Sequence, residues 1–195
     1  MSPSLRDELR AATQLHHNAI ENTIDLMRPD ITMADYVGYL CKFYGYYSGL
    51  ELRLIAGDLS FCNRALKLDG RRKVERLESD IGKLCGWKSL EKIPLCQFSP
   101  PVGNATDVVG CSYVIEGSTL GALIMYRHLY KCLGVTANNG ASFIYGYGES
   151  TGTQWKRFVE VIEAMTFDTR QRKACIEAAI ATFETMGNWF TKQAN

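Results

Sequence analysis

Apolar residues recur at intervals of three and four along nearly the whole chain, and the alternation typical of strands is almost absent. This spacing gathers the apolar side chains on one face of each helix, so the sequence predicts an all-α fold. No internal repeat and no long linker divides the chain, and we expect residues 1–195 to form a single domain. The expected helices cover residues 4–29, 32–54, 62–84, 108–133, 153–165 and 168–193, with loops at 87–107 and 134–152.

The charge balance and the cysteines exclude several classes of function. Lys and Arg number 22 against 21 Asp and Glu, for a net charge of +1, so no positive field favours a nucleic-acid partner. No run approaches the 18 apolar residues of a membrane span, and we find no signal peptide. Seven cysteines form an odd set without a CxxC pair, which predicts reduced thiols in a cytoplasmic protein. The balanced surface is compatible with a monomer.

The first expected helix carries two of the three histidines, His16 and His17. His17 and Glu21 are four residues apart and therefore meet on one face. The carboxylate could accept a hydrogen bond from the imidazole N–H that faces away from a metal. Arg10 lies two turns before His17 on the same face, about 10 Å along the axis. A histidine in this setting could bind a metal or haem iron; the alternative is a surface His–Glu pair beside an exposed arginine.

Three glycines interrupt the apolar helix expected over residues 108–133. In a helix interior each of Gly110, Gly117 and Gly121 costs about 1 kcal/mol relative to alanine. Gly117 and Gly121 are four residues apart with Ser118 between them, so they leave a stripe of bare backbone. A flat ligand could approach the helix there because Cβ atoms are missing. The alternative is close packing against another helix.

Three segments of the sequence, in the same order, resemble the haem oxygenases, most closely the bacterial biliverdin-forming members. They are the first-helix pattern L-R-x-A-T-x-x-x-H-x-x-x-E, the pattern Y-x-x-E-G-S-x-L-G that starts at Tyr113, and the stretch from Gly146 to Phe158. The resemblance covers nearly the whole chain. It implies one all-α, haem oxygenase-like helical bundle, with haem between the first helix and a glycine-containing distal helix.

The resemblance also implies roles for residues on the haem-ligand side. His17, rather than His16, falls where the family has its iron ligand, and Glu21 matches the acidic residue that hydrogen-bonds to that ligand. Arg10 corresponds to a basic residue that pairs with a haem propionate. Tyr113 corresponds to a tyrosine near the propionate edge.

On the opposite side of the haem, the resemblance assigns the catalytic wall to Gly117, Ser118 and Gly121. Gly117 and Gly121 match the glycines of the kinked distal helix that lies over the haem. Animal members carry an aspartate at the position of Ser118, which anchors the waters that deliver protons, whereas other bacterial members also carry serine. Lys156 is implied as a second propionate partner.

The activity that the resemblance implies is oxidative cleavage of haem b, which is both substrate and cofactor. O2 and electrons from an external reductase or ferredoxin would yield biliverdin, with the IXα isomer as the default, together with CO and Fe2+. The partners are then haem, O2 and an electron-donor protein. One alternative is a non-catalytic haem carrier or sensor of the same fold, which Ser118 keeps open. The other is a cofactor-free helical module.

Three further features predict ordinary structure. Residues 146–152 loosely resemble a dinucleotide-binding glycine loop, and residues 142–145 before them could form a short strand. No βαβ unit follows, so the glycines are more simply interpreted as turns. The charged residues at 71–76 predict a solvated helix face. His128, two turns beyond Gly121, is expected to pack or lie at the surface rather than bind iron.

Overall fold

The computed structural model describes residues 3–55, 60–97, 100 and 102–191. Helices and turns account for these residues without a strand among them, so the predicted all-α class is confirmed. The α-helices are α1 (Leu5–Thr23), α2 (Met33–Ile55), α3 (Ser60–Leu66), α4 (Val74–Cys85), α5 (Ala105–Gly117), α6 (Ala122–Leu133), α7 (Ser142–Tyr145), α8 (Thr151–Ala164) and α9 (Thr169–Thr191), and the short 3₁₀ helices are η1 (Leu68–Arg71), η2 (Trp87–Lys92), η3 (Ser118–Gly121) and η4 (Gly148–Ser150).

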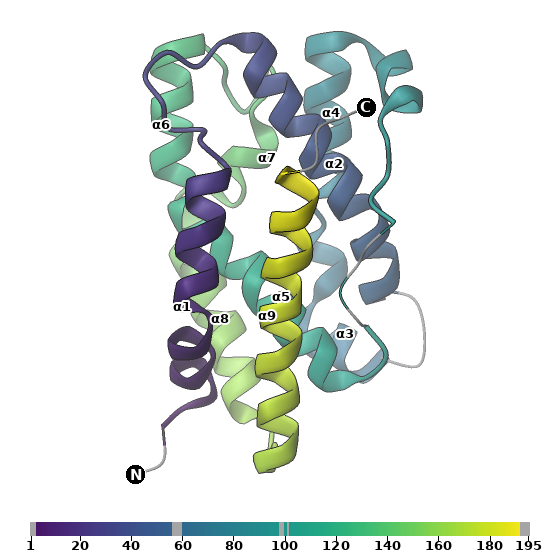
Figure 1. The fold of residues 1–195 in the computed structure, drawn as a ribbon, viewed down its shortest axis with the longest axis vertical. Helices are drawn as coiled ribbons and strands as arrows, with labels where there is room; N and C mark the ends of the chain where they lie inside the picture. The colour runs from purple at the N-terminus through teal and green to yellow at the C-terminus, as the bar shows by residue number, and fades with distance from the viewer. Residues whose placement is uncertain (1–2, 56–59, 98–99, 101, 192–195) are drawn as a thin grey trace.

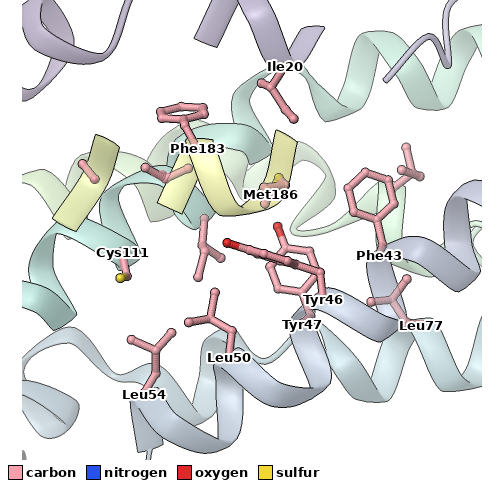
Figure 2. Close-up of a cluster of buried hydrophobic side chains, with 14 of the residues drawn as sticks. Ile20, Phe43, Tyr46, Tyr47, Leu50, Leu54, Leu77, Cys111, Phe183 and Met186 are labelled. Carbon is pink, nitrogen blue, oxygen red and sulfur yellow. The ribbon is translucent and has the colours of Figure 1, made fainter. Parts of the chain in front are cut away.

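The last helix occupies the middle of the bundle. α9 packs along α1 and against α5, while α2 pairs with α4 and α6 packs on α7 (Figure 1). Figure 2 shows buried side chains of α2 and α9 meeting in the core, Tyr46 and Tyr47 from α2 and Met186 from α9 among them. The Tyr46 hydroxyl donates a hydrogen bond to the Thr182 carbonyl oxygen at 3.0 Å, which satisfies its polar end inside the apolar core.

The first helix is anchored at its N-terminal end. Ser4 caps the helix, because its hydroxyl accepts the Asp7 N–H at 3.2 Å. The first two backbone N–H groups of α1 donate to the Glu163 carboxylate of α8, and Arg172 of α9 pairs with Glu8 at 2.9 Å. In the other half of α1, by contrast, most side chains over residues 14–22 are exposed.

The prediction of one continuous helix over residues 62–84 is wrong. The chain forms α3, η1 and α4 instead, and Lys67 breaks the helix with a left-handed φ of 53°. The Arg71 guanidinium donates from Nε to the Leu66 carbonyl oxygen at 2.8 Å, which satisfies a free carbonyl near the end of α3. The break places the side chains of Arg71 and Lys73 in the interior, although the charged residues at 71–76 predicted a solvated face.

The helix predicted over residues 108–133 is interrupted at η3, which joins α5 to α6. At the break, the Ser118 hydroxyl donates to the Ile115 carbonyl oxygen at 2.8 Å and the Thr119 hydroxyl donates to the Glu116 carbonyl oxygen at 2.6 Å. Such side-chain bonds compete with the regular helical pattern and bend the chain. The bend sits at the two glycines singled out in the sequence.

The stretch over residues 105–133 is the one described segment that could cross a membrane, judged by length and composition alone. However, 56% of its most apolar window is buried inside the protein, and α5 packs against α9. A core helix passes the same test of length and composition. This stretch is therefore weak support for a membrane association.

The glycine-rich loop near residue 146 makes turns, as expected. Gly146 and Gly148 have φ values of 56° and 55°, in the left-handed region that glycine adopts without strain. Residues 142–145, the possible strand of the dinucleotide-binding alternative, form the helix α7. The described part of the chain thus holds no βαβ unit.

Gly110 allows α5 and α9 to approach closely. A Cβ atom at Gly110 would lie 2.2 Å from the Cys175 carbonyl oxygen and 2.8 Å from the Ala178 Cβ. We therefore expect Gly110→Ala to lower the free energy of unfolding by about 1–3 kcal/mol, because the two backbones must separate. Urea denaturation followed by circular dichroism measures this change. Gly38→Ala, on an exposed helix position with no atom within 4 Å of the added Cβ, should not destabilise the protein.

Candidate functional site

A cavity of about 710 Å³ is lined mainly by α1 and the α5–α6 break, with side chains from α2, α7 and α9. Its volume lies within the roughly 300–1,000 Å³ that is usual for small-molecule and cofactor sites. Apolar side chains make up most of the wall, and a few polar groups are set among them. Seven of the residues predicted from sequence line this cavity: Arg10, His17, Glu21, Tyr113, Gly117, Ser118 and Gly121.

The two adjacent histidines have different surroundings. The His17 ring lines the cavity, its centroid lies 6.1 Å from that of Phe183, and its Nδ1 lies 3.4 Å from a Glu21 carboxylate oxygen. At this distance Glu21 can engage Nδ1, which would leave Nε2 as the ligand atom. His16 does not line the cavity; its Nε2 lies 3.5 Å from Glu184 on α9. The geometry thus distinguishes the two imidazoles.

Gly117, Ser118 and Gly121, which we call the glycine strip, form another part of the wall. A Cβ atom at Gly121 would meet nothing within 4 Å, and one at Gly117 would meet only the Trp155 ring at 3.7 Å. The space in front of the strip is therefore open cavity, unlike the space around Gly110. Ser118 also hydrogen-bonds with Tyr47, whose pKa is raised by burial, so this phenol stays protonated.

Two guanidinium groups form the cationic part of the cavity, and an aromatic pair lines the same cavity. Arg6 and Arg10 both line it from α1, together with Tyr113, whose ring lies 5.7 Å from that of Trp155. Burial raises the pKa of Tyr113 and the two arginines oppose this rise. Arginines in this arrangement favour a carboxylate on the ligand. Arg6 was not predicted, although it precedes Arg10 by one helical turn.

Lys156 is the one predicted residue that lies away from the cavity. Its side chain is 79% exposed, and its Nζ lies 3.9 Å from Glu160 on the outer face of α8. Successive residues of a helix point about 100° apart. Because Trp155 turns its ring into the cavity wall, Lys156 points elsewhere, and its role as a ligand partner stays a prediction.

Sequence reasoning missed Lys73, which lines the cavity although the segment 71–76 was predicted to be solvated. The residue is buried, and its Nζ donates to the Glu116 carboxylate at 2.8 Å and lies 3.3 Å from the Tyr147 hydroxyl. Its partners are 43 and 74 residues away in the chain. No local pattern indicates such pairing.

Core aromatics also contribute to the wall. Phe43 and Tyr47 of α2 belong to the buried core and also line the cavity. Phe183 and Met186 of α9 line the cavity as well. The helical spacing of such apolar residues indicates a buried face. It does not distinguish a face that lines a cavity from a face that packs against another helix.

The described residues contain no group of three or more His, Cys, Asp or Glu side chains that could hold a metal ion. A single imidazole at the cavity wall therefore suits a metal whose other ligands come from elsewhere. An iron held by a macrocycle has this property, since the protein adds only an axial ligand.

The Heme oxygenase family model matches residues 3–192. The chain belongs to the haem oxygenase family. Similar solved structures include the haem oxygenase from Neisseria meningitidis with NO and CO bound, at 20% identity and a TM-score of 0.81, covering 100% of this chain and 96% of that one. The haem oxygenase from Leptospira interrogans is 16% identical with a TM-score of 0.79, covering 97% and 99%.

A third similar structure is haem oxygenase-1 from the cyanobacterium Synechocystis in complex with haem, at 14% identity and a TM-score of 0.74, covering 96% of this chain and 91% of that one. No curated protein matches the sequence. At these identities the solved structures establish the haem oxygenase fold alone. The predicted family and fold are thus confirmed, and the roles of individual residues stay predictions.

Proposed function

We propose that this protein is an active haem oxygenase that cleaves haem b with O2 and external electrons, releasing biliverdin, CO and Fe2+. The observation that carries the proposal is that His17 and the glycine strip line one cavity. An imidazole and a side-chain-free backbone in one cavity of about 710 Å³ suit a flat, metal-bearing ligand. We expect the IXα isomer and a reductase or ferredoxin as electron donor.

The residues fit haem in four ways. The imidazole of His17 would hold the iron through Nε2, while Glu21, 3.4 Å from Nδ1, would orient the ring. The guanidinium groups of Arg6 and Arg10 give the propionates cationic partners. When bound there, haem would supply the redox chemistry of O2 activation. The glycine strip keeps that side of the cavity free of ionisable side chains of its own.

The fold leaves one alternative, a haem carrier or sensor that binds haem without turnover. Ser118 keeps this alternative open because a hydroxyl is a weaker proton donor than a carboxylic acid. We propose that residues 1–195 form one domain that acts as a cytoplasmic monomer.

Hemin titration tests the proposed function. Addition of hemin to the purified protein is expected to give a sharp Soret band at a 1:1 ratio, because an imidazole ligand orders the iron. Ascorbate or a ferredoxin with its reductase, under air, should then replace this band with bile-pigment absorbance. Chromatography of the product assigns the isomer. A stable Soret band under reducing, aerobic conditions would instead indicate a carrier, and a spectrum unchanged by the protein would contradict haem binding.

A further inference from the structure

A buried ion cluster lies directly behind the glycine strip. Glu116, the residue before Gly117, is 2% exposed and pairs with two cations, Arg71 and Lys73. The Tyr147 hydroxyl also donates to both of its carboxylate oxygens, at 3.2 and 3.0 Å. Buried charges are retained only where partners compensate their desolvation. The cluster has such partners, yet the proposed ligand contacts do not use it.

A second, smaller cavity lies on the other side of Glu116, and we call it the chamber. Its volume is about 30 Å³. Its wall combines the polar residues Glu51, Arg71, Arg72, Ser112 and Glu116 with the aliphatic residues Leu54, Ile55, Leu68 and Ile115. Since a water molecule needs roughly 10–15 Å³ measured in this way, the chamber has room for about two waters. Ser112 is 2% exposed, and its hydroxyl has no hydrogen-bond partner among the described residues. This orphaned hydroxyl and the carboxylates around it are the partners that a buried water requires.

The chamber and the main cavity are joined through two side chains. Glu116 lines the chamber and accepts a hydrogen bond from the Lys73 ammonium, while Lys73 lines the main cavity. On the outer side, Arg72 lines the chamber with a side chain that is 37% exposed. Polar groups therefore run from the protein surface through the chamber, Glu116 and Lys73 to the cavity.

We propose that Lys73 carries protons from the chamber waters into the main cavity. This inference rests on the proposed function, because O2 reduction in that cavity consumes protons as well as electrons. In each transfer the ammonium releases one proton to a water in the cavity. The resulting amine takes one proton from a chamber water through the Glu116 carboxylate, and solvent restores that water. The net change is one proton moved inward, with no electron transferred and no bond altered in the protein.

The charges around Lys73 favour such exchange. Burial lowers the pKa of Lys73 below its usual value, and the carboxylate of Glu116 opposes this effect. A lowered pKa makes an ammonium a better donor near neutral pH. The titratable and charged groups that face it are Glu116 from α5, Glu51 from α2, Arg76 from α4, Arg71 from η1 and the Tyr147 hydroxyl.

A charge-preserving substitution separates proton transfer from a purely structural role. Arginine keeps the positive charge and can bond Glu116, but it does not release a proton in proteins. We expect both Lys73→Arg and Lys73→Met to bind hemin with a normal Soret band. Both variants should convert hemin at least about tenfold more slowly, which is the loss typical of a missing general acid. The solvent deuterium isotope effect on the remaining rate should rise. Lys173→Met, an exposed lysine on α9 paired with Glu177, should behave as the parent protein.

The pH profile gives an independent readout. In the parent protein, turnover should fall as the pH rises through the pKa of Lys73, because the donor is then deprotonated. This alkaline limb should be absent from the residual rate of both Lys73 variants. Full turnover in Lys73→Arg, with the parent pH profile, would overturn the proposal and leave the ion pair a structural role.

Three measurements test the relay even if the Lys73 variants fail to fold. A high-resolution crystal structure of the parent protein should contain ordered water at Ser112, and 15N NMR should show Lys73 Nζ titrating below free lysine in the hemin-free protein. Ser112→Ala, which leaves the ion cluster intact, should slow turnover several-fold. A chamber without water, or Ser112→Ala at the parent rate, overturns the relay alone. A parent protein that leaves hemin unconverted contradicts the proposed function and, with it, the relay.

Discussion

His17→Ala is expected to abolish normal ligation of hemin. Among the described residues that line the cavity His17 is the one histidine, so the iron would lose its imidazole donor. Removing a hydrogen-bond partner of a metal ligand usually costs about 10–100-fold in affinity, and removing the ligand itself should cost at least the upper end of that range. A hemin titration followed at the Soret band measures the loss, and turnover should disappear with it.

His16→Ala is the matched control, since it removes the same group one residue earlier. His16 contacts Glu184 and does not line the cavity, so the Soret band and the hemin affinity should stay close to those of the parent protein. Addition of imidazole should partly restore the spectrum of His17→Ala, because the space of the lost ring can take up the free base. An equal loss in the two variants would contradict the assignment of the ligand.

Gly121→Leu is expected to separate stability from binding. A side chain at this position meets no protein atom near its Cβ and projects into the open cavity, where it would take the space of a flat ligand. We expect hemin affinity to fall at least about tenfold, which corresponds to about 1.4 kcal/mol of binding free energy. Folding should be unaffected or more stable by up to about 1 kcal/mol, because leucine favours helix over glycine.

Gly38→Leu is the control for this substitution. Gly38 is an exposed helical glycine on α2 with nothing within 4 Å of an added Cβ, and it does not line the cavity. It should gain the same helix propensity and leave hemin binding unchanged. Thermal denaturation and hemin titration of the two variants give both quantities. Normal hemin affinity in Gly121→Leu would mean that the glycine strip does not contact the ligand.

The fold was predictable from sequence wherever local physics decides it. The helical period gave the all-α class, and the Ser4 cap was predictable because a capping bond joins residues three apart. The α5–α6 break was visible as glycines in an apolar helix, but the sequence did not distinguish their causes. Gly110 serves contact with α9, whereas Gly121 faces the cavity.

The rest of the site depends on contacts between distant segments. Lys73 was predicted to be solvated because its neighbours are charged, and its true partner is Glu116 in another helix. Lys156 was implied by resemblance, but the orientation of α8 turns Trp155 inward and Lys156 outward. Such orientations follow from the packing of whole helices, which no local spacing specifies.

The uneven anchoring of α1 has a consequence for how a ligand enters the cavity. Glu163 and Arg172 tie the beginning of this helix to its neighbours, whereas the half that carries His17 has mostly exposed side chains. Segments with few buried contacts can open without global unfolding. A tilt of α1 about its fixed end would therefore widen the mouth of the cavity while the rest of the bundle stays intact.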